Sequence, residues 1–391
     1  MITITTGLEN FLTRPRSELA GKRIGLLCNP ASVNRQFLHA RDLIQQKFPG
    51  QLAALFSPQH GFFAEKQDNM VESADFMDND LKIPVFSLYG KTRIPTPEML
   101  DPIDVLIVDL IDVGTRVYTF TSTLSYCLAA VAALKKQVVV LDRPNPVGGI
   151  QVEGNCLIPA LRSFVGRYEI PMRHGLTMGE YAAFINETYA IGCDLNIIPM
   201  IGWRRRMYFH DTGLPWVTPS PNLPTPASAM VYPGQVIWEG TNISEGRGTA
   251  LPFEQFGAPF IDTDKILSFV NGPRIPGAVL RPVAFEPTAN KWAGQVCRGF
   301  QIHVTDPYAF HPFRTSLLLL QAILYHHRDQ FQWKPPPYEY EHEKLPFDMI
   351  VGNSIVRQQI ENMTPMDQIP DSWKNELDTY ISKAQKFHLY T

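Results

Sequence analysis

A short polar loop after residue 56 contains side chains suited to binding. The apolar run Leu52–Phe56 is typical of a buried strand, and the residues after it read Ser-Pro-Gln-His-Gly. In an open α/β sheet, ligands bind beyond the carboxyl ends of the strands, so this loop is a candidate site. The amide of Gln59 can orient a ligand, but it can neither donate a proton to a leaving group nor take one from water. Catalysis here would need carboxyl groups from elsewhere in the chain.

Three further loops follow apolar runs in the same way, after residues 28, 110 and 142. Because the carboxyl ends of parallel strands meet at one edge of a sheet, their side chains are expected to lie near His60. For any single residue, a role in packing is as well supported as a role in binding, and it is their joint occurrence that favours a site. The polar side chains of these loops are Asn29, Asp112, Arg116, Tyr118, Asp142, Arg143 and Asn145.

Carboxylates are concentrated in a second segment, WEGTNISEGRGT at residues 238–249. Glu239, Glu245 and Arg247 lie there among glycines, which favour a loop whose backbone can approach a ligand closely. The plainer alternative is that Arg247 only neutralises Glu245. Glu153 follows the turn RPNPVGG and is a third candidate, although a lone glutamate after a turn is more often a solvated surface residue.

The elements that must position these loops alternate between strand and helix. Unalternated apolar runs, typical of strands covered on both faces, occupy 23–28, 52–56, 84–88, 104–110, 137–142 and 194–200. Helical patterns occupy 34–48, 122–136 and a segment that begins at a Thr177-x-x-Glu180 capping box. This rhythm predicts an α/β domain with a doubly wound sheet over about residues 1–215.

The rhythm breaks at a proline-rich stretch, residues 215–233. Beyond it the pattern is mixed, with strands expected near 280–286 and 299–305 and a long helix near 313–328. Residues 216–391 are therefore predicted to form a second domain of the α+β class.

Composition narrows the function further. The 391 residues carry a net charge of −3, which gives no general reason to bind nucleic acid or an anionic membrane. No run approaches the roughly 20 apolar residues that span a bilayer, and no signal peptide is visible, so a cytoplasmic location is expected. The five cysteines form no C-x-x-C pair, so no zinc site is predicted. The glycine fingerprints of nucleotide-binding loops are absent, which disfavours a nucleotide-using enzyme and predicts no cofactor.

Several long motifs together resemble one known family. They include SPQHGF, DVLIVDLIDVGTRVYTF, VVLDRPNPVGGIQVEGN, GLPWVTPSPNLPTPASAMVYPG and WEGTNISEGRGTALPFEQFGAP. In this order they are similar to the exo-β-N-acetylmuramidase family of bacterial glycoside hydrolases. The resemblance implies a Rossmann-like N-terminal domain, a C-terminal auxiliary domain and an active cleft between them. It also implies that terminal N-acetylmuramic acid is released from the non-reducing end of peptidoglycan fragments, without a nucleotide cofactor, as in cell-wall recycling.

The resemblance also suggests roles for residues in the matching motifs. Glu239 or Glu153 would be the general acid, with Glu245 and Asp112 as further catalytic candidates. Arg116, Arg143 and Arg247 are the candidates for binding the lactyl carboxylate of muramic acid, since a guanidinium can hold a carboxylate through two hydrogen bonds. The remaining residues assigned to substrate binding are Gln59, His60, Tyr118, Asp142, Asn145, His174, Asn222 and Asn242.

This sequence departs from the family pattern at position 59, where family members commonly have glutamate. Glycoside hydrolysis normally uses two carboxyl groups, so three accounts stay open. In the first, other carboxyls perform the chemistry and Gln59 only orients the sugar. In the second, the acetamido group of the substrate acts as nucleophile. In the third, the protein binds muramyl glycans without cleaving them.

Overall fold

A seven-stranded sheet organises the first half of the chain. The computed structural model describes residues 4–68, 70–270 and 275–391. The strand order is β3-β4-β2-β1-β5-β6-β9, and every neighbouring pair is parallel except β3 with β4. If β3 is left out and the other six strands are numbered along the chain, the order is 3-2-1-4-5-6, as in doubly wound nucleotide-binding folds. The strand order reverses between β1 and β5. The strands are β1 Ile24–Cys28, β2 Leu52–Ser57, β3 Phe76–Met77, β4 Pro84–Ser87, β5 Val105–Asp109, β6 Gln137–Leu141 and β9 Asp194–Ile198.

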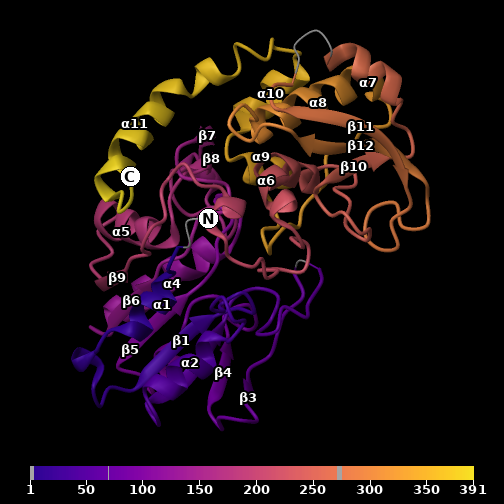
Figure 1. The fold of residues 1–391 in the computed structure, drawn as a ribbon. Coiled ribbons are helices and arrows are strands. Elements are labelled where there is room, and N and C mark those ends of the chain that lie inside the picture. Colours follow the sequence, from indigo (N-terminus) through magenta and orange to yellow (C-terminus); the bar gives the residue numbers. More distant parts are fainter. Residues whose placement is uncertain (1–3, 69, 271–274) are drawn as a thin grey trace.

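Helices cover both faces of this sheet, as the unalternated strands predict (Figure 1). Along β5, Val105 and Ile107 join the hydrophobic cluster under α1 and α2, whereas Leu106 and Val108 join the cluster under α4 and α5. Strands buried on both faces cannot alternate apolar and polar residues, which explains the pattern in the sequence. The helices of this half are α1 Gly7–Thr13, α2 Ala40–Lys47, α3 Pro97–Leu100, α4 Phe120–Ala133 and α5 Met178–Thr188.

The second half of the chain combines a small antiparallel sheet with helices. The strands β10 Gln255–Ala258, β11 Ala278–Phe285 and β12 Cys297–Val304 form a sheet of order β10-β12-β11. Its helices are α6 Pro226–Gln235, α7 Thr263–Val270, α8 Pro312–His327, α9 Pro346–Val351, α10 Ser354–Glu361 and α11 Lys374–Ala384. A two-stranded sheet, β7 Glu153–Cys156 with β8 Pro171–Arg173, lies in the first half of the sequence. The short 3-10 helices are η1 Ser17–Leu19, η2 Pro159–Leu161, η3 Phe209–Thr212, η4 Val236–Gly240, η5 Pro370–Ser372 and η6 Gln385–Phe387.

Most of the predicted elements are confirmed, and two differ for local reasons. The helix expected over 34–48 begins only at Ala40, because the side chain of Asn34 accepts hydrogen bonds from the backbone N–H groups of Gln36 and Leu38 and holds a turn. The proline-rich stretch contains α6, which begins at Pro226 behind a Thr225 cap. Proline is accepted in the first turn of a helix because its missing N–H has no partner there.

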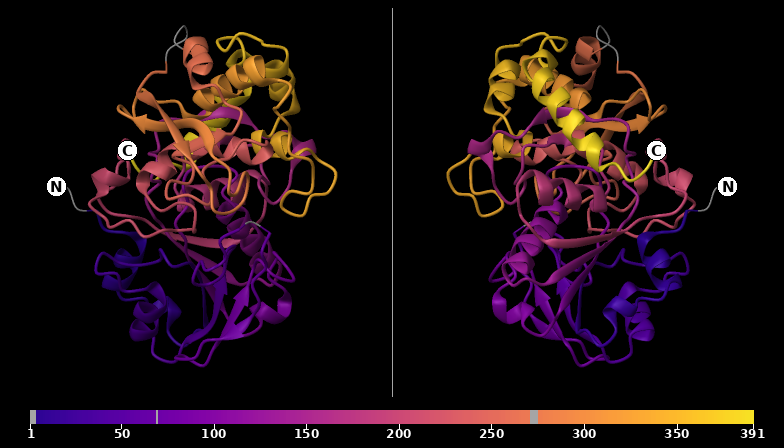
Figure 2. Two further views of the ribbon diagram at one scale, coloured as in Figure 1. Left: turned by 90° about the vertical axis from the view of Figure 1, so that its right-hand side faces the viewer. Right: turned by 90° about the vertical axis from the view of Figure 1, so that its left-hand side faces the viewer.

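The last residues of the chain return to the first sheet. Tyr390 donates a hydrogen bond to Asp142 over 2.5 Å, and the backbone N–H of Leu389 donates to Glu180 over 2.8 Å. Figures 1 and 2 show α11 running back beside the magenta part of the chain. One hydrophobic cluster also extends from β5 through α6 to α11. The predicted division at residues 215 and 216 is therefore crossed by packing and by hydrogen bonds.

Two further observations concern membrane-spanning helices and cysteines. None of the described helices is long and apolar enough to cross a membrane. The five cysteines are all buried and unpaired.

A buried ion pair lies at the carboxyl end of β5, next to the point where the strand order reverses. Arg143 donates from Nε and Nη2 to the two carboxylate oxygens of Asp109 over 2.6 Å each, and from Nη1 to the carbonyl of Val33 over 2.7 Å. We expect Asp109→Asn to lower the free energy of unfolding by about 3 kcal/mol or more, because it leaves the guanidinium buried without its counter-charge. Thermal unfolding followed by calorimetry would measure the loss.

The matched control is Asp104→Asn, which breaks the solvent-exposed pair with Arg23. Exposed pairs contribute little to stability, so this variant should melt close to the wild type. Equal melting temperatures for both variants would contradict the structural role assigned to the buried pair.

Candidate active site

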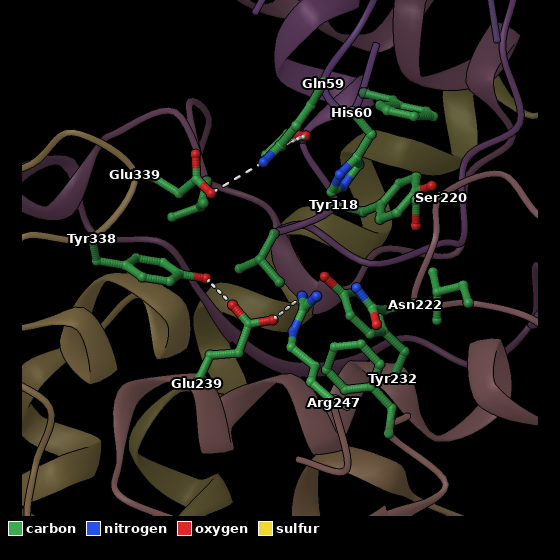
Figure 3. Close-up of a pocket in the computed structure, with 16 residues that line it drawn as sticks. Gln59, His60, Tyr118, Ser220, Asn222, Tyr232, Glu239, Arg247, Tyr338 and Glu339 are labelled. Carbon is green, nitrogen blue, oxygen red and sulfur yellow. Dashed lines mark hydrogen bonds and ion pairs between the residues drawn. The ribbon is translucent and has the colours of Figure 1, made fainter. Parts of the chain in front are cut away.

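A buried pocket lies where the loop after β2 meets three segments distant in sequence (Figure 3). Gln59 and His60 come from that loop, and the segment 117–120 leads into α4. Glu239 comes from η4, and Glu339 comes from a loop near residue 340. The pocket is lined by Gln59, His60, Val117, Tyr118, Thr119, Phe120, Val165, Ser220, Asn222, Leu223, Tyr232, Glu239, Arg247, Phe253, Tyr338 and Glu339.

The carboxylate of Glu239 is held at both oxygens. Arg247 donates from Nη2 to Oε1 over 2.8 Å, and the hydroxyl of Tyr338 donates to Oε2 over 2.6 Å. Burial alone would raise the pKa of Glu239, but the charge and hydrogen bond of Arg247, with that of Tyr338, outweigh burial and lower it. Glu239 is therefore a fixed, ionised carboxylate in a buried pocket.

Arg247 links the pocket to a chain of buried charges. Its Nε lies 3.2 Å from Oε1 of Glu245, and the second oxygen of Glu245 lies 2.7 Å from Nζ of Lys291. The Nη1 atom of Arg247 is buried and has no hydrogen-bond partner within the described part of the chain. A buried donor without a partner is costly, so this atom is suited to an acceptor on a ligand.

Gln59 joins the pocket to a second carboxyl group that the sequence analysis did not single out. The hydroxyl of Thr119 donates to Oε1 of Gln59 over 2.6 Å, and Nε2 of Gln59 donates to Oε1 of Glu339 over 3.2 Å. The hydroxyl of Tyr89 donates to the other oxygen of Glu339 over 2.6 Å. Burial, the largest effect, and the nearby charge of Glu239 raise the pKa of Glu339.

His60 is a neutral side chain on an unusual backbone. Its φ of 79° is in the left-handed region, which few residues other than glycine and asparagine adopt readily. Nδ1 lies 2.7 Å from the carbonyl oxygen of Lys66 and so carries the proton as donor, which leaves Nε2 as an acceptor. Burial, reinforced by the nearby Arg247, lowers the pKa of His60 to about 4.

A wider groove adjoins the pocket on the side of Lys291. It has a volume of about 420 Å³ and shares Glu239, Arg247 and Tyr338 with the pocket as common walls. Its other lining residues are Asp68, Met70, Thr241, Asn242, Glu245, Asn290, Lys291, Gln332, Trp333, Lys334 and Pro335. The pocket and the groove are therefore neighbours on either side of Glu239.

The structure brings only part of the predicted site together. The pocket contains Gln59, His60, Tyr118, Asn222, Glu239 and Arg247, and the groove contains Asn242 and Glu245. Two predicted arginines are used elsewhere. Arg116 is buried and donates to the carbonyls of Asn155, Ile170, Ile350 and Val351, while Arg143 pairs with Asp109.

The other predicted residues outside the pocket stabilise turns and helix ends. Asp142 accepts from Thr177 and from the N–H of Gly179 at the start of α5. Asp112 lies 3.1 Å from Nε2 of His174, away from the pocket lining. Asn145 bonds to the backbone of Val147 and Leu176, and Glu153 accepts from the N–H of Arg314 at the start of α8.

The sequence offered a weak signal for Glu339 and Tyr338. Both follow three consecutive prolines in a long segment between helices, and long ordered loops are often functional. The signal could not reveal the partner of Glu339, since Gln59 lies 280 positions earlier in the chain.

The chemistry that the pocket can perform follows from its two carboxyl groups. Glu239 is biased toward the ionised form and Glu339 toward the protonated form. Two titratable groups with pKa values moved apart are typical of an acid–base pair in an enzyme. In the described parts of the chain, no group of three or more histidine, cysteine, aspartate or glutamate residues is placed to hold a metal ion.

Comparison with known proteins identifies the family. Residues 24–227 match the family model "Exo-beta-N-acetylmuramidase NamZ, N-terminal", and residues 230–390 match "Exo-beta-N-acetylmuramidase NamZ, C-terminal". This chain belongs to the NamZ exo-β-N-acetylmuramidase family. The resemblance drawn from the motifs is thereby confirmed.

Individual relatives are similar to this chain over nine tenths or more of their length. The chain is 41% identical over 387 residues to the peptidoglycan β-N-acetylmuramidase NamZ of Bacillus subtilis (strain 168), which covers 99% of this chain and 91% of the relative. Crystal structures of two DUF1343 family proteins from Bacteroides fragilis NCTC 9343 are also similar. One has a TM-score of 0.88 at 32% identity and covers 100% of both chains, and the other has 0.78 at 26% and covers 99% of both.

The depressed pKa of His60 predicts an acid-sensitive fold. The unfolded chain protonates this histidine near pH 6.5, while the folded protein resists protonation until about pH 4. Stability contributed by the neutral ring is therefore complete above pH 6.5 and declines as the pH falls toward 4, by up to about 3 kcal/mol. Denaturant unfolding at several pH values should show a shallower decline in His60→Asn, since asparagine tolerates the left-handed backbone.

An exposed histidine, His303, provides the control. His303→Asn should follow the pH dependence of the wild type. If His60→Asn did the same, the buried neutral ring would not be the source of the acid sensitivity.

Proposed function

We propose that this protein is an exo-acting glycoside hydrolase that releases N-acetylmuramic acid from the non-reducing end of peptidoglycan fragments. Membership of the NamZ family and the activity for which the Bacillus subtilis relative is named support the reaction. The observation that carries the proposal is the buried pocket in which Glu239 is fixed as a carboxylate opposite Gln59 and Glu339. An ionised carboxylate there can stabilise the positive charge that develops at the anomeric carbon.

Arg247 is the residue proposed to recognise the lactyl carboxylate of muramic acid. Of the three predicted arginines, Arg143 is paired with Asp109, and Arg116 lies outside the pocket lining with Nη1 and Nη2 directed to backbone carbonyls. Arg247 lines the pocket and keeps Nη1 unpaired among the described residues. A carboxylate at this atom would satisfy a buried charged donor.

The groove beside the pocket is proposed to hold the remainder of the glycan. It is large enough for a sugar and opens on the opposite side of Glu239.

The proposed architecture is a Rossmann-like domain over residues 1–215 and an auxiliary domain over 216–391, with the active cleft at their junction. Support comes from the pocket itself, whose walls come from both regions, and from the two family models, which meet between residues 227 and 230.

The alternative of a muramyl-glycan binder without hydrolytic activity has no supporting observation. The pocket retains two carboxyl groups although position 59 carries an amide. The cytoplasmic location stays a prediction from the sequence.

Hydrolysis of a chromogenic aryl N-acetyl-β-muramide tests the proposed reaction. We expect turnover of the muramide by the wild type and little turnover of the corresponding glucosaminide. Glu239→Gln should lower kcat by about 10³-fold or more, because the amide removes the charge that stabilises the transition state. Release of monomeric N-acetylmuramic acid from purified muropeptides would establish exo action.

The matched control is Glu343→Gln, which changes an exposed glutamate in the loop that bears Tyr338. It should keep the wild-type rate. Full activity in Glu239→Gln would remove Glu239 from the mechanism.

Selectivity for muramic acid tests Arg247 separately. Calorimetric binding of free N-acetylmuramic acid and N-acetylglucosamine should show tighter binding of the acid by the wild type. In Arg247→Gln the preference should shrink by about 10- to 100-fold, since a hydrogen bond to a charged group contributes about 1.5 to 3 kcal/mol. An unchanged preference would assign the lactyl group to another residue.

A further inference from the structure

The contact between Gln59 and Glu339 bears on which group of the pocket can supply a proton. An amide cannot protonate a leaving oxygen, so another group must supply the proton. Glu339 is the second carboxyl group of the pocket, and Nε2 of Gln59 lies 3.2 Å from its Oε1.

The backbone at Glu339 has an unfavourable conformation that neighbouring contacts must stabilise. Glu339 and Tyr340 have φ values of 47° and 65°, both in the left-handed region. Side chains on both sides hold this turn, since Tyr338 donates to Glu239 over 2.6 Å and Tyr340 donates to the carbonyl of Met70 over 3.1 Å. Non-glycine residues persist in this conformation where surrounding contacts enforce it, and such residues cluster at active sites.

Hydrogen bonds also fix the orientation of the Glu339 carboxyl group. Thr119 donates to the amide oxygen of Gln59, which directs the amide nitrogen toward Glu339. Tyr89 donates to the second oxygen over 2.6 Å. The guanidinium of Arg93 lies 3.9 Å from the ring centroid of Tyr340 and 4.8 Å from that of Tyr89. Glu339 is 5% exposed.

The groups that face Glu339 have opposing effects on its pKa. Burial, the largest effect, and the carboxylate of Glu239 on η4 favour the protonated form. Tyr89, Gln59 and the charge of Arg93 favour the ionised form, and the balance leaves the pKa raised. Glu239, by contrast, is kept ionised by Arg247 and Tyr338. The pocket thus favours protonation of one carboxyl group and ionisation of the other.

We propose that Glu339 is the general acid of this enzyme and that Gln59 is its positioning residue, in place of a carboxyl group at position 59. The inference rests on the proposed muramidase function. It names a catalytic residue 280 positions from the loop that carries the sequence motif.

The step balances with these residues alone. The bond between the anomeric carbon and the glycosidic oxygen breaks, and its electron pair goes to the oxygen, which takes the proton of Glu339. Glu239 stabilises the positive charge on the sugar. Water then adds to the anomeric carbon, and the proton that it releases restores the carboxyl group of Glu339.

Leaving groups of different acidity separate a general acid from the other roles. A dinitrophenyl muramide needs no proton to depart, whereas a phenyl muramide does. In Glu339→Gln, kcat/KM on the phenyl substrate should fall by about 10²- to 10⁴-fold, while kcat/KM on the dinitrophenyl substrate should fall less than about tenfold. Glu239→Gln should lose both, and the exposed control Glu343→Gln should lose neither.

The pH profile provides a second readout. A general acid must be protonated, so kcat/KM of the wild type should fall on the alkaline side, and this limb should flatten in Glu339→Gln. Gln59→Leu removes a donor that favours ionised Glu339, so it should move the limb to higher pH and lower kcat on the phenyl substrate with little change in KM. Gln59→Glu should move the limb in the same direction through like-charge repulsion.

The outcomes distinguish the inference from the function on which it rests. Equal losses on both substrates in a folded Glu339→Gln, or an unmoved alkaline limb in both Gln59 variants, would overturn the inference while leaving the muramidase standing. A wild type that cleaves neither aryl muramide nor muropeptides would overturn both. Circular dichroism and thermal melting of each variant show whether a loss of activity reflects a loss of fold.

Discussion

The cost of removing charge from water is the constraint on which this structure depends. A buried ion is stable only with an opposite charge and hydrogen bonds to its remaining atoms. Among the described residues, arginine meets this requirement by pairing with a buried carboxylate: Arg143 with Asp109, Arg205 with Glu180 and Arg247 with Glu239. The first ties the end of β5 to the segment after β6, the second attaches α5 to the segment after β9, and the third fixes the carboxylate of the pocket. The same electrostatic rule thus builds both the scaffold and the site.

Much of the first sheet could be predicted because its physics is local. Strands covered on both faces must be apolar throughout, and the start of α5 follows from the capping box at Thr177. What could not be predicted depends on contacts between distant segments. The contacts of Leu389 and Tyr390 with the first sheet leave no periodic pattern in the sequence. The helix predicted from residue 34 begins later because the side chain of Asn34 stabilises a turn.

The site was predictable to the extent that it obeys the rule for sheet edges. Gln59, His60 and Tyr118 follow strands of the sheet and do line the pocket. The rule does not show which polar residues at that edge already have partners within the fold. It therefore could not separate Arg116 and Arg143, which bind backbone carbonyls and Asp109, from Arg247, which lines the pocket. Glu339 lies on no strand of the sheet, and only the folded chain shows that its carboxyl group faces the amide of Gln59.

The attachment of Tyr390 to Asp142 also has a consequence for synthesis on the ribosome. The two residues are 248 positions apart, so at roughly 5 to 20 residues per second the carboxyl group waits about 12 to 50 s for this partner. Thr177 and Gly179 reach Asp142 much earlier and can hold the start of α5 in the meantime. During synthesis the first sheet therefore forms before Asp142 has its hydrogen bond from Tyr390. That bond can form only when the last residues of the chain have left the ribosome.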